Sequence, residues 1–304
     1  MSLFTGLQPY RFLYYIIRPM DVTFRSGTAA DAPACGKIGY EAFKAIAEHH
    51  NFPPDFPSAE IAIALYAMIL GRSDIFSIVG ERDGQIVCSN FLWEGDAIAG
   101  VGPITVLPAA QNVSLGRRLM QSVLDRAESR NQAGVRLVQA AYHNRSLSLY
   151  TKLGFRAQEP LSILQGPPLQ LELSGYRVRQ ASLDDLKACN AVCRMVHGHD
   201  RRSEVTRAID DGIATVVEHG GRITGYATGL GFFGHAVGRT NEELKALIGA
   251  APAFTGPGFL LPTRNTELLQ WCFHHGLRIV QPMTLMSLGL YQKPAGSFLP
   301  SILY

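Results

Sequence analysis

The sequence predicts a mixed α/β protein made of two similar domains, and three observations lead to this prediction. Its 304 residues suit two domains of roughly 100–200 residues each. Short motifs recur in the same order in its two halves, which is typical of a duplicated fold. In each half an antiparallel hairpin of apolar runs precedes helices that alternate with strands, and this order indicates a mixed sheet with helices on its faces.

The repeated motifs also indicate where the domains begin and end. Each half has an arginine, then an aspartate six residues later and a cysteine ten residues later. Each half also has a glycine six residues before a proline near its end. Gly166-Pro167-Pro168 interrupts regular structure between the copies, so we predict domains at 20–166 and 167–304, with residues 1–19 as an N-terminal extension or tag. The matched pairs are Arg25 and Arg179, Asp31 and Asp185, Cys35 and Cys189, Gly154 and Gly276, and Pro160 and Pro282.

The elements of the first domain each have a local signal. Short runs rich in apolar and β-branched residues predict strands, and Asp83-Gly84 predicts a hairpin turn between two of them. Apolar residues at 115, 119, 120, 123, 124 and 127 lie on one face of a helix. The predicted strands are 22–25, 76–81, 85–93, 98–107, 135–141 and 156–164, and the predicted helices are 29–47, 115–130 and 146–153.

The second domain shows the same order of elements. Thr240 and Glu243 form a capping-box pattern at the start of one of its helices. The predicted strands are 176–180, the hairpin 213–230, 257–261 and 283–290, and the predicted helices are 183–195, 241–250 and 266–275.

Composition excludes several classes of protein. The formal net charge is only +3, whereas nucleic-acid binding usually leaves a dense basic stripe, so we expect no nucleic-acid partner. No apolar run approaches the roughly 18 residues of a membrane span, so we expect no membrane partner. Five cysteines without CxxC spacing favour reduced thiols and a cytoplasmic location. His197-Gly198-His199-Asp200 resembles a metal cluster, but no matching ligands accompany it, so we expect a solvated loop and no metal.

A loop between a predicted strand and a predicted helix suits an anion. The strand ends near Pro108, and the helix begins around Leu115. Free N–H groups at a helix start, together with the helix dipole, attract phosphate. Small residues let a phosphate approach the backbone closely, and the arginines that follow add positive charge.

A second motif lies downstream, and at this point the sequence resembles the GCN5-related N-acetyltransferase (GNAT) superfamily. That family has a cofactor loop of the form Q/R-x-x-G-x-G/A, which Gln111 to Gly116 reproduces except for Ser114 in the place of the first glycine. Its later motif matches Asn144, Tyr150 and Gly154 with their neighbours. The resemblance implies two tandem GNAT-like domains, each a mixed, mostly antiparallel twisted sheet flanked by helices.

The resemblance also implies an acetyl-CoA site and the roles of its residues. The strand before the loop would offer backbone groups to the pantetheine arm, the loop would wrap the pyrophosphate, and Asn144 would bind the pantetheine. Tyr150 would lie near the sulfur and protonate the departing thiolate, since a phenol with an ordinary pKa of about 10 is a competent donor. The residues assigned to the cofactor are Ile104, Thr105, Val106, Gln111, Asn112, Val113, Ser114, Leu115, Gly116, Arg117 and Asn144.

The base that deprotonates the acceptor amine is less evident. Family members often carry a glutamate on the strand that leads to the loop, but residues 99–105 hold no carboxylate. Glu94, Asp96 and His143 are the nearby candidates, and an ordered water is the alternative. His143 has the most suitable ordinary pKa, so we assign it to the catalytic set. The turn from Phe52 to Pro57 either lines the acceptor site or only connects helices.

The predicted function is therefore acetyl transfer from acetyl-CoA to a primary amine of a small molecule or peptide. The second copy has Cys272 where the first has Tyr150, so it is predicted to be degenerate. Its glycine-rich stretch 231–240 remains an alternative anion site, which would give two active domains. The rival from another class is a non-catalytic acyl-CoA-binding or regulatory module. A homodimer is expected only by analogy with the family.

Overall fold

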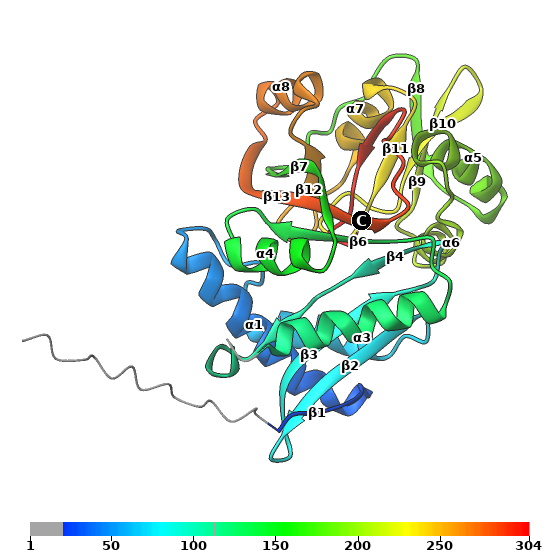
Figure 1. Cartoon of the computed structure of the whole chain (residues 1–304). Helices are drawn as coiled ribbons and strands as arrows, with labels where there is room; N and C mark the ends of the chain where they lie inside the picture. Colours follow the sequence, from blue (N-terminus) through cyan, green and yellow to red (C-terminus); the bar gives the residue numbers. More distant parts are fainter. Residues whose placement is uncertain (1–20, 112–113, 304) are drawn as a thin grey trace, which may run out of the picture.

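The computed structural model describes residues 21–111 and 114–303. The predicted extension 1–19 lies outside these ranges. In Figure 1 the first half of the chain (blue to green) occupies the lower part of the molecule, the second half (yellow-green to red) the upper part, and strands β6, β7 and β13 lie between them. No helix in the described part of the chain is both long and apolar enough to cross a bilayer.

The first half follows the predicted order with two changes. The predicted strand 98–107 is divided into β4 and β5, which are separated by Gly102, Pro103 and Ile104. A helix that the sequence did not predict, α2, follows the turn at Phe52–Pro57. The elements are β1 (Thr23–Ser26), α1 (Ala32–His49), α2 (Ala59–Leu70), β2 (Ile75–Arg82), β3 (Gln85–Trp93), β4 (Ile98–Val101), β5 (Thr105–Val106), α3 (Leu115–Ser129), β6 (Gly134–Ala140), α4 (Asn144–Lys152) and β7 (Arg156–Gln165).

The second half repeats this order, and it also adds elements that were not predicted. These are helix α6 and the short strands β11 and β14, the last of which lies near the C-terminus. The elements are β8 (Tyr176–Gln180), α5 (Leu186–His197), α6 (Arg202–Asp210), β9 (Thr215–His219), β10 (Arg222–Ala227), β11 (Ala236–Gly238), α7 (Asn241–Ala250), β12 (Phe259–Pro262), α8 (Thr266–His274), β13 (Arg278–Gly289) and β14 (Ser297–Leu299).

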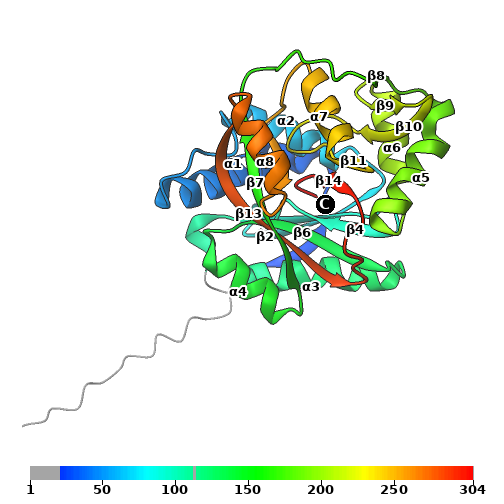
Figure 2. The same cartoon turned by 90° about the horizontal axis from the view of Figure 1, so that it is seen from above.

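The two halves exchange strands. The larger sheet has the order β1-β2-β3-β4-β6-β13-β7-β12, with β5 beside β3, and the smaller sheet has the order β14-β11-β10-β9-β8. Strand β13 lies antiparallel between β6 and β7 of the first half, while β7 lies between β13 and β12 of the second half. Each of these two long strands therefore has both neighbours in the other half, and Figure 2 shows them crossing together through the middle of the molecule.

Because of this exchange, the predicted domain boundary at residue 166 does not separate the larger sheet into two parts. Backbone pairing continues from Met283 opposite Ala140 to Gly289 opposite Gly134. The sheet of the first half is thus completed by β13, whose residues lie more than a hundred positions after their partners in β6. The predicted mixed, mostly antiparallel sheets flanked by helices are confirmed, and the two sheets match the predicted duplication.

The repeated arginine and aspartate form the same ionic clasp in both halves. Arg25 donates to both carboxylate oxygens of Asp31 at 2.8 Å and to Glu81 at 3.1 Å. Arg179 donates to Asp185 at 2.7 and 2.9 Å and to Glu218 at 2.8 Å. Each aspartate also accepts the N–H of the residue three positions before it, Thr28 or Ser182, at 2.8 Å. The spacing of six residues between arginine and aspartate therefore corresponds to the same ion pair in both halves.

The helices cover opposite faces of the larger sheet. Leu92 belongs to the apolar cluster beneath α3 and α4, and its neighbour Phe91 belongs to the cluster beneath α1 and α2. Alternate residues of a strand point to opposite faces, so the two clusters lie on the two sides of the sheet. All five cysteines are buried and unpaired, as small apolar core residues.

We predict that Asp31→Asn and Asp185→Asn each lower the free energy of unfolding by about 1 kcal/mol, since each removes the charge from a helix-capping clasp. Arg25 lowers the pKa of Asp31 to about 2 from an ordinary 3.8. A carboxylate with a lowered pKa stabilises the fold above its unfolded pKa, and this contribution is lost as the pH falls. Urea unfolding should therefore show the difference from wild type shrinking between about pH 4 and pH 2.

The matched control is Asp83→Asn in the hairpin turn, where the side chain is 93% exposed. It should change the free energy of unfolding by no more than about 0.5 kcal/mol. Equal effects of all three substitutions would contradict the structural role of the clasp.

Candidate functional site

The larger sheet opens between β5 and β6. Strand β4 pairs in parallel with β6 only from Ile98 opposite Gly134 to Gly100 opposite Arg136. Strand β5 pairs with β3, through Thr105 opposite Ser89 and Val106 opposite Cys88. Within the described residues the other edge of β5 has no strand partner, so its backbone groups face the gap toward the end of β6. An unpaired edge of this kind can accept an extended ligand as an added strand.

The predicted cofactor loop follows this edge. Gln111 donates from Nε2 to the carbonyl of Val106 at 3.2 Å, and its Oε1 accepts Nη1 of Arg145 at 3.4 Å. Ser114 precedes α3 with φ at 65°. This left-handed conformation favours glycine, and Ser114 stands where the family loop has its first glycine. The predicted contacts of Asn112 and Val113 lie outside the described residues.

The start of α3 is suited to an anion. Ser114 makes no side-chain cap among the described residues, and the first turn contains no acidic residue. The first N–H groups of the helix are therefore available, and Arg117 is exposed beside them. Arg118 is instead bound to the carbonyl of Val22, at 3.1 Å. Helix starts that are uncapped and positively charged attract phosphate through the dipole and through direct hydrogen bonds.

Helix α4 lies against this loop, since Arg145 in its first turn donates to Gln111. A Cβ added at Gly116 would lie 3.4 Å from Cδ2 of Leu149, so this glycine lies within van der Waals distance of a side chain of α4. Asn144 begins α4 and is exposed. The structure therefore brings together Gln111, Gly116, Asn144 and the end of β5 around one opening.

Tyr150 lies on the buried face of α4. The residue is 6% exposed, and its ring is 6.2 Å from the ring of Phe155. Its hydroxyl makes no hydrogen bond within the described part of the chain. Burial raises the pKa of Tyr150 well above its ordinary value, so the phenol keeps its proton at neutral pH.

His143 lies directly before α4. Burial, together with the positive charges of Arg145 and His50, lowers the pKa of His143 to about 4. The imidazole is therefore neutral at physiological pH, where it can accept a proton but is a weak base.

The other two candidates for the base have structural partners instead. Glu94 is paired with Arg126 at 2.5 and 2.8 Å. Asp96 accepts the N–H of Ser203 at 2.9 Å and that of Glu204 at 3.2 Å, at the start of α6. Both carboxylates lie just before β4, at the opposite end from the loop.

The turn between α1 and α2 contributes to the site in a way that the sequence only suggested. Phe52 stacks on Tyr142 with ring centroids 4.3 Å apart. Asp55 accepts Nε2 of Gln281 at 2.8 Å, and Gln281 lies on β13. The turn therefore reaches the end of β6, next to His143. Tyr142 and Gln281 were not predicted, and the prolines around Asp55 were the only signal for the turn.

The corresponding region of the second half is closed. Strand β14 pairs with β11 from Ala236 opposite Leu299 to Gly238 opposite Ser297, so it covers the edge that is open on β5. Helix α7 begins only three residues after β11. Thr240 caps this helix, and Glu243 accepts the hydroxyl and the N–H of Thr240 at 2.6 and 2.8 Å. The stretch 231–240 is thus taken up by β11 and a capped helix start.

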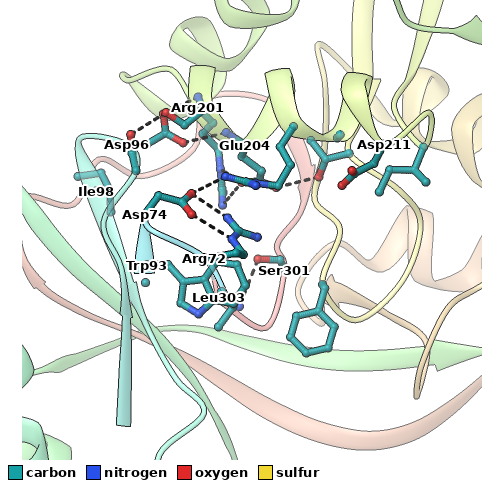
Figure 3. Close-up of a pocket in the computed structure, with 18 of the residues that line it drawn as sticks. Arg72, Asp74, Trp93, Asp96, Ile98, Arg201, Glu204, Asp211, Ser301 and Leu303 are labelled. Carbon is teal, nitrogen blue, oxygen red and sulfur yellow. Dashed lines mark hydrogen bonds and ion pairs between the residues drawn. The ribbon is translucent and has the colours of Figure 1, made fainter. Parts of the chain in front are cut away.

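A separate cavity of about 290 Å³ lies between the two halves. Figure 3 shows Trp93 and Leu303 in its wall, and Asp74 beside Arg72. Asp74 is 2.8 Å from Arg72 and 2.6 Å from Arg207. Asp74 is therefore paired with both arginines, and the cavity lies beside the start of β4, away from the loop.

Glu204 is also drawn in Figure 3. Burial alone would raise its pKa, but Arg201 and His235 together lower the pKa of Glu204 far below its ordinary value. The buried carboxylate is thereby held ionised as part of a network that fixes α6, 2.7 Å from the hydroxyl of Thr228.

The prediction of a solvated loop at 197–200 was wrong for His197. This residue ends α5, is only 2% exposed and packs its ring 5.3 Å from the ring of Phe298. The reason is that β14 packs against the end of α5. Among the described residues no group of three or more histidine, cysteine or acidic side chains could hold a metal ion.

Comparisons with known proteins agree with this geometry. Residues 73–157 match the family model described as an acetyltransferase (GNAT) domain. A protein named IAA acetyltransferase, from Azospirillum brasilense, is 28% identical over 129 residues, which cover 41% of this chain and 84% of that protein.

Two solved structures resemble the chain over most of its length. One is a provisionally assigned acetyltransferase from Pyrococcus horikoshii, with a TM-score of 0.69 and 15% identity, over 98% of this chain and 97% of that one. The other is a GCN5-related N-acetyltransferase from Sphaerobacter thermophilus, with a TM-score of 0.60 and 16% identity, over 90% and 96%. At these identities the similarity establishes the fold.

Residues 73–157 are therefore similar to the GNAT acetyltransferase domain, and the likeness of the chain to the two solved structures is one of fold. This stretch contains the open edge of β5, the loop and the start of α3.

We predict that the His143 imidazole titrates near pH 4 in NMR spectra, because burial and nearby positive charge disfavour its protonated form. Arg145→Gln should shift the midpoint to higher pH, since it removes one of those charges. His143→Gln identifies the resonance. A midpoint close to the ordinary value of 6.5 would contradict the buried, electropositive setting.

Proposed function

We propose that the chain transfers an acetyl group from acetyl-CoA to a primary amine of a small molecule or peptide by direct attack. One observation carries the proposal: the unpaired edge of β5 leads to an uncapped helix start that has arginines and no acidic residue in its first turn. The edge suits the amide-bearing pantetheine arm, and the helix start suits the pyrophosphate.

The cofactor would contact residues of three segments. Backbone groups of Ile104, Thr105 and Val106 would pair with pantetheine. The loop and the start of α3 would hold the pyrophosphate, with Arg117 adding charge. Asn144 would bind the pantetheine from the start of α4. The proposed pyrophosphate contacts are Gln111, Asn112, Val113, Ser114, Leu115, Gly116 and Arg117.

The reaction would proceed without a covalent enzyme intermediate. The amine lone pair forms a bond to the thioester carbonyl carbon, and the bond between carbon and sulfur then breaks. Tyr150 would donate its proton to the departing thiolate, and its buried phenol holds that proton at neutral pH. His143 would accept the proton that the amine loses, since its imidazole is neutral above about pH 4.

The second half would support the first without binding cofactor. Strand β14 covers the edge of β11, and Glu242 and Glu243 place negative charge in the first turn of α7. Acidic residues at a helix start oppose phosphate binding. This contrast favours one working site over two.

Tyr150→Phe should lower kcat by about a hundredfold, since it removes the proposed general acid, while the Kd for CoA stays unchanged. Acetyl-CoA turnover with a panel of primary amines measures the rate, and calorimetry measures binding. The control is Tyr176→Phe, a tyrosine of the second half whose ring stacks on His219, and it should keep the wild-type rate. Cofactor binding without turnover of any amine would instead favour a binding or regulatory module.

Calorimetric titration with CoA should give one equivalent per chain, because only the first half has an open strand edge beside an uncapped helix start. Ser114→Val should weaken this binding, since a β-branched residue fits a positive φ poorly, while Ser114→Gly should retain it. Two equivalents, or one that is insensitive to Ser114→Val, would contradict the assignment.

A further inference from the structure

Asp55 is a carboxylate that the described structure leaves without a cationic partner. It lies in the turn between α1 and α2, with prolines at positions 53, 54 and 57. Its Oδ1 accepts Nε2 of Gln281 at 2.8 Å, and no ion pair to it occurs among the described residues. Burial raises the pKa of Asp55, which indicates that its charged form is poorly hydrated.

Gln281 is itself held in one orientation. Its Oε1 accepts the hydroxyl of Tyr142 at 3.0 Å, so its amide must present Nε2 to Asp55. Tyr142 is in turn fixed by stacking on Phe52. This series of contacts joins residues of the α1–α2 turn, the end of β6 and β13. It therefore includes residues from both halves of the protein.

A purely structural role in the hydrogen bond to Gln281 does not explain why residue 55 is an aspartate. An asparagine at position 55 could accept the same hydrogen bond from Gln281 without a poorly hydrated charge, and such a charge is costly unless it is paired. The side chains around the turn include the aromatic rings of Phe52, Phe56 and Tyr142, and aromatic faces also attract cations. Tyr142 directly precedes His143, the proposed proton acceptor. The missing partner is therefore a cation that arrives at the catalytic end of the sheet.

We propose that Asp55 binds the ammonium group of the acceptor amine, and that Gln281, supplied by β13 of the second half, is a positioning residue for Asp55. This inference rests on the proposed acetyl transfer and adds the group that recognises the acceptor. It also gives the second half a direct part in the site of the first.

The test measures binding of amines to the complex with CoA by calorimetry, with wild type and Asp55→Asn. The amines are butylamine, phenethylamine and spermidine, and the uncharged analogues are butanol and 2-phenylethanol. Asp55→Asn keeps the acceptor for Gln281 and removes only the charge. The Kd of the amines that bind should rise about tenfold or more, as expected for a charge-assisted hydrogen bond, while that of the alcohols stays within about twofold.

Gln281→Met separates positioning from folding. As a single substitution it should raise the amine Kd several-fold. The double variant with Asp55→Asn and Gln281→Met should bind the amines no more weakly than Asp55→Asn alone, because Gln281 acts through Asp55. The matched control is Gln158→Met, which removes another hydrogen bond between β7 and β13, from Gln158 to Ser287 at 2.6 Å. It should leave the amine Kd unchanged.

The outcomes distinguish this inference from the proposed function. Ammonium binding that depends on Asp55, without acetyl transfer, would support the site and refute the proposed reaction. Acetyl transfer with equal amine affinity in wild type and Asp55→Asn would refute the role of Asp55 alone. If none of the amines binds, the proposed ammonium site is overturned. If the effects of Asp55→Asn and Gln281→Met on the amine Kd are fully additive, the positioning role of Gln281 is overturned.

Discussion

The insertion of β13 between β6 and β7 is the constraint on which the rest of the structure depends. Its antiparallel pairing with β6 extends over seven residue pairs, from Met283 to Gly289. Because β6 is paired along this edge, its position in the sheet is fixed, and its pairing with β4 ends at Gly100, before β5 begins. The opening at β5 is therefore held by a strand of the other half. The same insertion places Gln281 beside the α1–α2 turn, so one set of backbone hydrogen bonds determines both the opening proposed for the cofactor and the proposed acceptor site.

The two halves show how one scaffold can have opposite electrostatics at the same place. Both have the arginine–aspartate clasp before the first helix, and both have a later helix that follows a short strand: α3 after β5 and α7 after β11. In the first half that helix starts without a side-chain cap and with arginines at its first turn. In the second half Thr240 satisfies the first N–H groups, and Glu242 and Glu243 add negative charge. A capping box stabilises a helix by occupying the groups that phosphate would use, so we expect the better-capped copy to be the poorer phosphate site.

The sequence predicted what local patterns encode. The strand at 176–180, the helix at 241–250 and the start of α3 at 115 agree with the structure, because capping and periodicity act over a few residues. Helix α2 was missed because it is apolar almost all round, so no period distinguishes it. The cofactor loop stays a prediction, which rests on the spacing of Gln111, Gly116 and Asn144. The contact between Asp55 and Gln281 spans 226 positions and depends on the strand exchange, which no local pattern reveals.

The strand exchange also bears on why a degenerate copy would be retained. A second half that only covered the sheet could be replaced by any apolar surface. Here β13 supplies backbone partners to two strands of the first half and an oriented amide at its far end. The hydroxyl of Tyr142 and the carboxylate of Asp55 both depend on that amide for their hydrogen bonds. Whether the second half binds cofactor has no effect on this position, whereas a shift of β13 by one residue would turn Gln281 to the opposite face of the sheet. The requirement on the second half is therefore one of register, and it is independent of whether that half binds a ligand of its own.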